Sequence, residues 1–231
     1  MTERFGQGFV IDPRQGWPLM TVDLDKRNAS PEASGDSAKR RQIIDGACRM
    51  FLSQGFDAAS MGAIAREAGV SKGTLYVYFK SKEELFEAIV EEQCRQQAEQ
   101  IFTLDTEAPI EAELKRLGEQ FTRFLCRPGG VSPLRTVIAI ADRMPELGAK
   151  FYHSGPARGI ASLQRYLEDK VAAGLLEPHD SEVAAAQFID SCLSTTFKPM
   201  LFNCAGPPED ARIGHVVDMA VRAFLAAYRR R

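Results

Sequence analysis

Residues 61–85 read MGAIAREAGVSKGTLYVYFKSKEEL and contain the signals for two short helices and the start of a third. Ser60 and Ser71 stand where helix N-caps are expected, and Gly69 stands where the first short helix would end. The SKEE run at 81–84 is typical of a capping box that opens a long helix. Two short helices joined by a tight turn predict a helix-turn-helix motif.

The second helix of this motif divides into an inward and an outward face. Leu75 and Phe79 lie four positions apart and are predicted to hold the helix on its domain. The outward residues suit DNA, because glycine lets the backbone approach closely, threonine reaches a base edge, and tyrosine hydroxyls and lysines reach phosphates. The predicted DNA contacts are Ser60, Lys72, Gly73, Thr74, Tyr76, Tyr78 and Lys82. The pattern alone leaves an alternative open, because helix-turn-helix shapes occur without DNA and tyrosines often serve in packing.

Charge is distributed unevenly along the 231 residues. Residues 1–36 hold four cations and six acids, whereas residues 37–82 hold eight cations and three acids, a net charge of +5. Residues 83–231 hold 17 cations and 22 acids, and the whole chain has a net charge of −2. A basic segment on an acidic body is expected where one small region meets phosphate groups and the rest does not.

The remaining sequence predicts an all-α fold. Residues 1–36 are rich in Gly, Pro, Ser, Asn and Asp, so we expect a disordered tail in which Met20 is a second candidate start. Helical periodicity covers almost all of residues 37–231, and no segment alternates with period two for long. Helices are expected at 37–53, 82–104, 109–126, 132–142, 145–173, 180–203 and 208–229, with a kink or split at Gly155 and Pro156. We predict a tail (1–36), a small domain with the motif (37–82) and a larger helical domain (83–231).

Several classes of protein are disfavoured by what the sequence lacks. No apolar run approaches the roughly 18 residues of a membrane span, and no secretory signal is present, so we expect a cytoplasmic protein. Five cysteines without C-x-x-C spacing and three scattered histidines disfavour a disulfide framework and a zinc site. Without G-x-S-x-G, P-loop or H-E-x-x-H motifs, we expect neither enzymatic activity nor a cofactor.

Residues 38–85 resemble the DNA-binding domain of TetR/AcrR-family transcriptional regulators. The resemblance is carried by Phe51 with Gly55 and Phe56, the run IAREAGVSKGTLYVYF at 64–79, and SKEEL at 81–85. It implies an all-helical homodimer whose subunits each have a three-helix N-terminal DNA-binding domain and a larger ligand-binding domain. Ligand binding in such proteins usually releases DNA. The family's usual contacts carry over, by position, to the seven residues already named.

Two positions qualify this resemblance. Gly62 occupies a place where some members have a base-reading side chain, so base recognition must rely on the second helix of the motif. Lys39, Arg40 and Arg41 precede the first helix of the core, where some members reach into the minor groove.

Residues 137–156, VIAIADRMPELGAKFYHSGP, and the amphipathic helix after them resemble the C-terminal domain of AefR-like and AcrR-like members. The resemblance implies a small effector, which we expect to be apolar or amphipathic, in an apolar pocket. The candidate pocket residues are Phe102, Phe121, Phe124, Ile140, Phe151, Phe188 and Phe197. For each of them, packing in an ordinary core is the alternative interpretation. Small and apolar residues in the last two helices predict a dimer through a four-helix bundle, as in the family.

Together these features predict a repressor whose dimer binds a palindromic operator in double-stranded DNA. Two recognition helices about 34–36 Å apart would read such a site. A small molecule entering the C-terminal core would shift the fourth helix, which begins near Lys82, and so weaken DNA binding. Two alternatives remain: a regulator of the same fold that switches by oxidation of Cys94 or Cys126, and a DNA binder that responds to no ligand.

Overall fold

The computed structural model describes residues 31–230, without the side chains of residues 31–35, 52, 93, 95, 96 and 98. Most of the predicted tail, including Met20, lies outside the described residues. Within 31–230 the regular elements are helices, apart from an isolated bridge between Leu176 and Arg229, so the predicted all-α class is confirmed. None of the helices in this range has the length and apolar character needed to span a lipid bilayer.

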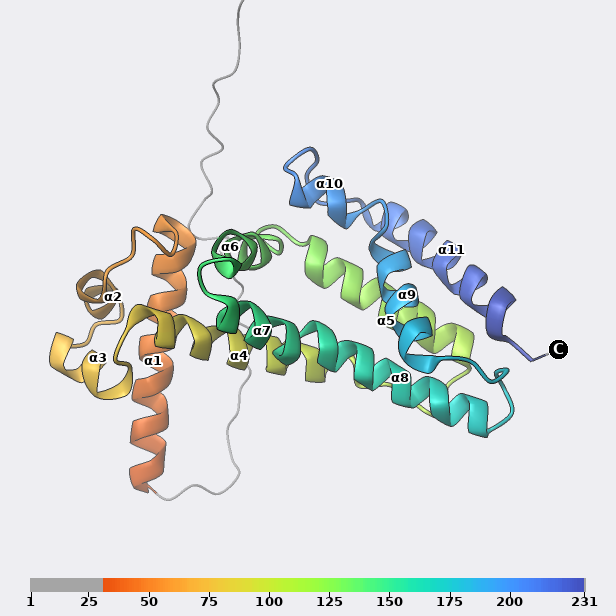
Figure 1. The fold of residues 1–231 in the computed structure, drawn as a ribbon, viewed down its shortest axis with the longest axis horizontal. Coiled ribbons are helices and arrows are strands. Elements are labelled where there is room, and N and C mark those ends of the chain that lie inside the picture. The colour runs from red at the N-terminus through yellow and green to blue at the C-terminus, as the bar shows by residue number, and fades with distance from the viewer. Residues whose placement is uncertain (1–30, 231) are drawn as a thin grey trace, which may run out of the picture. The chain divides into compact units, whose positions relative to one another are not determined.

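The helices follow one another with short connections (Figure 1). Their bounds are α1 (Pro31–Gln54), α2 (Met61–Glu67), α3 (Lys72–Tyr78), α4 (Lys82–Ile101), α5 (Ile110–Cys126), α6 (Ser132–Ala141), α7 (Pro145–Ser154), α8 (Pro156–Ala172), α9 (Ser181–Leu193), α10 (Phe197–Leu201) and α11 (Asp210–Tyr228).

Two helix boundaries differ from the sequence prediction, and a third agrees with it. Helix α1 begins at Pro31, before the predicted start at Ser37, because proline suits the first position of a helix. The predicted split at Gly155 is present, and Pro156 begins the next helix. The segment predicted as one helix over 180–203 is divided into α9 and α10. Hydroxyl residues at 194–196 separate the two helices, and such side chains compete with helical backbone hydrogen bonds.

The described residues separate into two compact units, one ending at Phe86 and the other beginning at Glu87. Helix α4 starts in the first unit and continues into the second. The functional division at residues 82–83 stays a prediction.

The first unit packs α1, α2 and α3 around a small apolar core. The rings of Phe51, Phe56 and Phe86 meet with centroids 5.2–5.4 Å apart. Gly46 lets α1 approach α2, because a Cβ at this position would lie 2.6 Å from the Cα of Ala68. The fully buried side chains are Ile43, Ile64, Leu75 and Leu85. This core fixes the motif that the sequence predicts.

The second unit has a main core formed by α5, α8, α9 and α11. Helices α5 and α11 approach closely at Gly118, where a Cβ would lie 2.8 Å from a methyl group of Val217. Fully buried residues of this core include Leu114, Leu117, Leu163, Leu167 and Cys192. A smaller cluster of Cys126, Val131, Phe197 and Met200 lies at the other end of α5. The two clusters hold the helices of this unit in place.

Candidate nucleic-acid interface and ligand cavity

The helix-turn-helix is built by two serine caps and one glycine turn. The Ser60 hydroxyl accepts from the backbone N–H of Ala63 at 3.2 Å, and the Ser71 hydroxyl accepts from that of Thr74 at 3.0 Å. Gly69 has φ +65°, a left-handed conformation in which L side chains are strained. These contacts end α2 and start α3 at the positions that the sequence indicated.

Helix α3 presents its polar side outward. Leu75 is completely buried, whereas the neighbouring Tyr76 and Val77 are 51% and 81% exposed. Lys72 and Gly73, in the first turn, are also exposed. Thr74 is half-buried, and its hydroxyl lies 2.8 Å from that of Ser71, within hydrogen-bond distance. The N-terminal half of α3 is therefore a rigid, exposed surface of hydroxyl, amide and ammonium groups.

Gly62 and Lys72 form a pair that sequence reasoning missed. A Cβ at Gly62 would lie 2.8 Å from the Cε of Lys72. The lysine side chain thus lies across the bare backbone of the first turn of α2. At Gly62, where some members of the family have a side chain, the aliphatic stem and the charge of Lys72 from α3 occupy the space. A glycine ten positions before a lysine gives no periodic signal, so only the packing of α2 on α3 could reveal it.

Tyr78 is not a free phenol, since its hydroxyl donates to Asp36 Oδ1 at 2.5 Å. This hydrogen bond stabilises the neutral phenol and raises the pKa of Tyr78 above its ordinary value. Asp36 belongs to α1, in a segment that the sequence predicted as tail, so this contact was not anticipated. The structure places an acid beside one of the predicted DNA contacts.

Lys82 is anchored by the first unit itself. Its Nζ donates to the carbonyls of Phe56 at 3.0 Å and Asp57 at 3.2 Å, and lies 4.6 Å from the centroid of the Phe56 ring. An ammonium has three donors, so one remains for another partner. Glu84 N donates to Ser81 Oγ at 3.1 Å and Glu84 Oε2 accepts from Lys80 N at 2.7 Å, so the predicted capping interaction at the start of α4 is confirmed.

Lys39, Arg40 and Arg41 lie inside α1 and not before the first helix as predicted, because α1 already begins at Pro31. The Arg40 guanidinium lies 5.4 Å from the centroid of the Phe79 ring, and Lys39 donates to Gln42 at 3.0 Å. Arg41 is exposed. The predicted minor-groove role of these three side chains stays a prediction.

The candidate pocket residues lie in several places rather than around one space. Phe102 and Phe121 meet edge to face with centroids 5.5 Å apart. Phe188 packs against Phe224 in the main core, and Phe197 is buried in the smaller cluster. Of the remaining three, Ile140 is buried, Phe151 is half-buried, and the Phe124 ring lies under the guanidinium of Arg127 at 3.9 Å.

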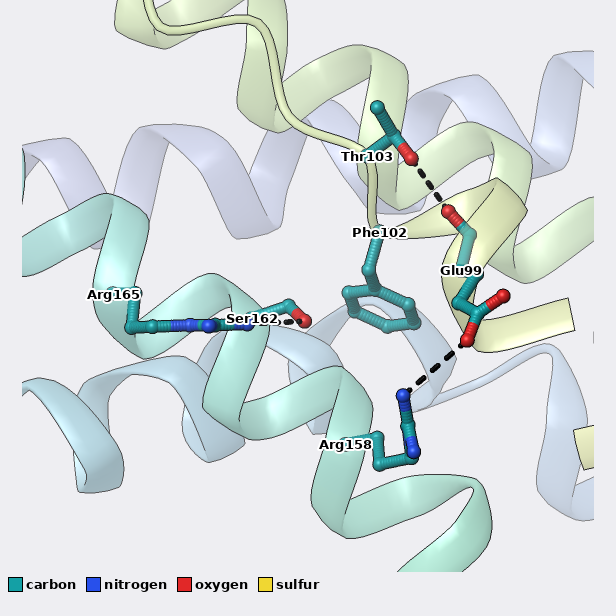
Figure 2. A pocket seen from close by; sticks show the side chains of 6 residues that line it. All are labelled: Glu99, Phe102, Thr103, Arg158, Ser162 and Arg165. Carbon is teal, nitrogen blue, oxygen red and sulfur yellow. Dashed lines mark hydrogen bonds and ion pairs between the residues drawn. The ribbon is translucent and has the colours of Figure 1, made fainter. Parts of the chain in front are cut away.

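One cavity, of about 250 Å³, includes a predicted residue. It is lined by Glu99, Phe102, Thr103, Arg158, Ser162 and Arg165, from the end of α4 and from α8 (Figure 2). A second hollow, of about 450 Å³, lies where α8 leads into α9 and includes none of the seven. Sequence reasoning missed the two arginines, because charged residues on an amphipathic helix normally indicate a solvated face.

A buried carboxylate fixes the connection that follows α4. Glu113 is 3% exposed and accepts from Arg116 Nε at 2.8 Å and from the backbone N–H of Asp105 at 2.9 Å. Arg116 also donates to the carbonyl of Thr103 at 2.9 Å. The Arg116 guanidinium holds the pKa of Glu113 below its ordinary value. The wall of the cavity at Thr103 is therefore tied to α5.

The cysteines named for a redox switch are poor nucleophiles. Burial raises the pKa of Cys94 to about 12 and also raises that of Cys126. Oxidation proceeds through the thiolate, which such an environment disfavours. Within the described range, no group of three or more His, Cys, Asp or Glu side chains could hold a metal ion.

Comparisons with known proteins agree with this geometry. The family model for the AefR-like transcriptional repressor C-terminal domain matches residues 112–230, and that for bacterial regulatory proteins of the tetR family matches residues 43–89. The solved structure of a TetR-family regulator from Mesorhizobium loti MAFF303099 is 33% identical, with a TM-score of 0.78; the match covers 84% of this chain and 98% of that one. The flavonoid-responsive regulator FrrA is 32% identical, with a TM-score of 0.74 and coverage of 84% and 99%.

Curated relatives match over the DNA-binding region. The HTH-type transcriptional repressor Rv1474c of Mycobacterium tuberculosis is 37% identical over 70 residues, which are 29% of this chain and 37% of that protein. AcrR of Shigella flexneri is 46% identical over 52 residues, which are 22% of this chain and 24% of AcrR. The chain thus spans well under two thirds of these two relatives. Since one family model alone matches more than half of the chain, the protein belongs to the TetR family of DNA-binding transcriptional regulators, with an AefR-like C-terminal domain.

Proposed function

We propose that this protein is a homodimeric repressor that a small apolar or amphipathic molecule releases from a palindromic operator. The observation that carries the proposal is the exposed N-terminal half of α3, held in place by the buried Leu75. A short helix with an exposed first half is the geometry that the major groove accepts.

The proposed DNA contacts divide by their chemistry. Thr74, in the first turn of α3, suits a base edge, and Gly73 beside it lets the backbone approach DNA closely, whereas Ser60 and Tyr76 suit phosphates. Lys72, Tyr78 and Lys82 would also meet phosphates, the last through the donor that its carbonyl contacts leave over. Phosphate contacts position the protein, and the contacts to base edges select the sequence.

Dimerisation is supported by apolar side chains left outward on neighbouring helices. Val183 on α9 is 47% exposed and Met219 on α11 is 50% exposed. Helices α9 and α11 pack against each other in the second unit, so both can contribute to one face. Covering these side chains in a two-fold dimer would remove apolar surface from water.

Release by a small molecule is supported by α4 and by a relative. Helix α4 begins at Lys82 and ends at Ile101, next to Phe102 in the cavity wall. One continuous helix therefore links a residue proposed to meet DNA with a residue that a ligand could touch. FrrA, named as flavonoid-responsive, aligns over almost its whole length. We expect an effector of comparable aromatic or amphipathic character here.

Selection from a pool of random duplexes tests the DNA-binding part of the proposal. The full-length protein should enrich a palindrome, and its affinity should fall steeply as salt rises, because phosphate contacts release counterions. Tyr76→Ala should weaken binding about tenfold, the value of one hydrogen bond to a charged group. Tyr152→Ala, at an equally exposed tyrosine of α7, should leave affinity unchanged. Enrichment of no palindrome, or equal losses for the two variants, would contradict the proposal.

A further inference from the structure

We infer that the cavity between the end of α4 and α8 selects a small aromatic anion, an inference that rests on the proposed release by a small molecule. Phe102 would contact the ring, and Arg158 and Arg165 would bind the negative group. The cavity has the right size for this class. Its volume of about 250 Å³ lies just below the roughly 300–1,000 Å³ that is usual for ligand pockets. That space suits a one- or two-ring acid and is small for a long acyl chain.

The lining carries an excess of positive charge. Among the six lining residues, Arg158 and Arg165 are the two cations and Glu99 is the only acid. Figure 2 shows Phe102 among these side chains, with Glu99 on the α4 side and Arg158 and Ser162 on α8. An anion entering here would meet two guanidinium groups, whose planar forks match a carboxylate better than an ammonium does.

Both arginines have contacts that a ligand could improve upon. Arg158 Nη2 lies 3.4 Å from Glu99 Oε1, and Arg165 Nη2 lies 3.5 Å from Ser162 Oγ. Hydrogen bonds of N–H to oxygen are usually about 2.7–3.2 Å long, so both contacts are weak. The side chains of Arg158 and Glu99 are 50% and 51% exposed, which weakens their attraction further. A ligand carboxylate would therefore displace only weak contacts when it binds these two arginines.

Gly159 and Phe121 hold the Phe102 ring in the wall of the cavity. A Cβ at Gly159 would lie 2.7 Å from Cζ of Phe102, so the ring rests directly on the backbone of α8. The edge-to-face contact with Phe121 holds the ring from the α5 side. A bound aromatic ring could stack on or meet the edge of Phe102, a favourable geometry for such pairs. The site thus offers one ring contact and two charge contacts.

Occupation of this site would act on α4. Glu99 lies in the last turn of α4 and Phe102 directly follows it, whereas both arginines belong to α8. A carboxylate that takes Arg158 away from Glu99 removes a tie between the two helices. A ring that moves Phe102 displaces the end of α4 directly. Ligand binding would therefore favour a different position of α4, as release requires.

Calorimetric titration of the full-length protein with benzoate, cinnamate and 2-naphthoate, each beside its neutral amide, tests the inference. We expect at least one acid to bind about tenfold more tightly than its amide, because charge-assisted hydrogen bonds are lost in the amide. Arg158→Gln and Arg165→Gln should each weaken binding of that acid about tenfold. Lys198→Gln, at an exposed cation of α10 that is not part of the cavity, should leave it unchanged.

Three results would overturn the inference: no acid binds at millimolar concentration, acids and amides bind equally, or both arginine variants keep full affinity. Urea unfolding of each variant shows whether it is folded. Operator binding with and without the acid then separates the two proposals. An acid that binds through the arginines without releasing DNA supports the site and contradicts release. Release that persists in both arginine variants places the effector elsewhere and overturns the site alone.

Discussion

The first unit and the cavity differ in how their cations are held. In the first unit, Lys82 donates to two carbonyls at 3.0 and 3.2 Å, and Arg49 pairs with Glu67 at 2.6 Å. In the cavity, Arg158 and Arg165 have contacts of only 3.4 and 3.5 Å. Short contacts preorganise a surface for a partner of fixed shape such as DNA. Contacts as long as those of the two arginines are weak, so these side chains can bind a ligand in place of their present partners. The cavity is therefore the region where a ligand could alter the contacts between helices.

Removal of the Lys82 ammonium should have the largest effect, because it tests whether the short contacts of this lysine stabilise the first unit. Lys82→Met should lower the free energy of unfolding by about 2 kcal/mol, because two hydrogen bonds from a charged group to backbone carbonyls are lost at a partly exposed site. Denaturant unfolding measures the loss. If Lys82 also meets a phosphate, the slope of log affinity against log salt should fall by about 1.

Lys80→Met is the matched control, since this exposed lysine lies two positions away in the same basic segment. It should leave the free energy of unfolding unchanged. A stable Lys82→Met protein would remove the contrast between Lys82 and the cavity arginines. A destabilised variant with an unaltered salt dependence would restrict Lys82 to an anchoring role.

A methyl group added at Gly159 would test the cavity, where Phe102 packs on this glycine. Gly159→Ala places a Cβ 2.7 Å from Phe102 Cζ, so the ring must move. Overpacking costs about 1–3 kcal/mol and the better helix propensity of alanine returns about 1 kcal/mol, so a net loss of about 1 kcal/mol is expected. The affinity for an aromatic acid should fall with it.

Gly148→Ala in α7 provides the comparison, because its Cβ meets only Ala141, with the Cβ of that residue 3.4 Å away. That variant should be as stable as the wild type or more so. Unchanged acid binding in Gly159→Ala would show that Phe102 does not belong to the ligand site.

Replacement of Asp36 should have the smallest effect of these changes, and it should act specifically through Tyr78. Because Asp36 accepts from the neutral phenol, Asp36→Asn should lower the pKa of Tyr78 toward its ordinary value of 10.0, as ultraviolet titration of the tyrosines would report. In the wild type this contribution to stability is present below the ordinary pKa and lost as pH rises through the raised value. At neutral pH, removal of an acid beside the proposed DNA contacts should tighten operator binding a few-fold.

Tyr78→Phe removes the hydroxyl and isolates this effect. In that background Asp36→Asn should no longer shift any tyrosine pKa. A titration curve that Asp36→Asn leaves unaltered would contradict the role given to this hydrogen bond.

Local signals explain why the first unit could be predicted in detail. Ser60, Ser71 and Gly69 act within four residues of their own positions, so their roles are visible in the sequence and confirmed by the caps and the turn. The split at Gly155 is likewise local. Asp36 and Tyr78 are 42 positions apart, and no local rule connects them.

The cavity depends on longer connections still. Arg158 and Glu99 are 59 positions apart and meet only because α8 lies beside the end of α4. Phe102 lines the cavity, but aromatic composition alone could not separate it from Phe188, which packs in the core. Which phenylalanine faces a space depends on side-chain packing, and Gly159 decides it for Phe102.

The absence of a side chain at Gly62 affects how many operator positions the protein can distinguish. With Lys72 lying across the first turn of α2, this turn would present an aliphatic stem and an ammonium that suits a phosphate, and no hydrogen-bonding fork for the bases. An ammonium at the end of a flexible chain discriminates poorly between bases, so the positions beneath α2 should vary among selected sites while those beneath α3 stay fixed. Such a regulator can bind operators that differ at the positions beneath α2. One unchanged protein can therefore act at several promoters.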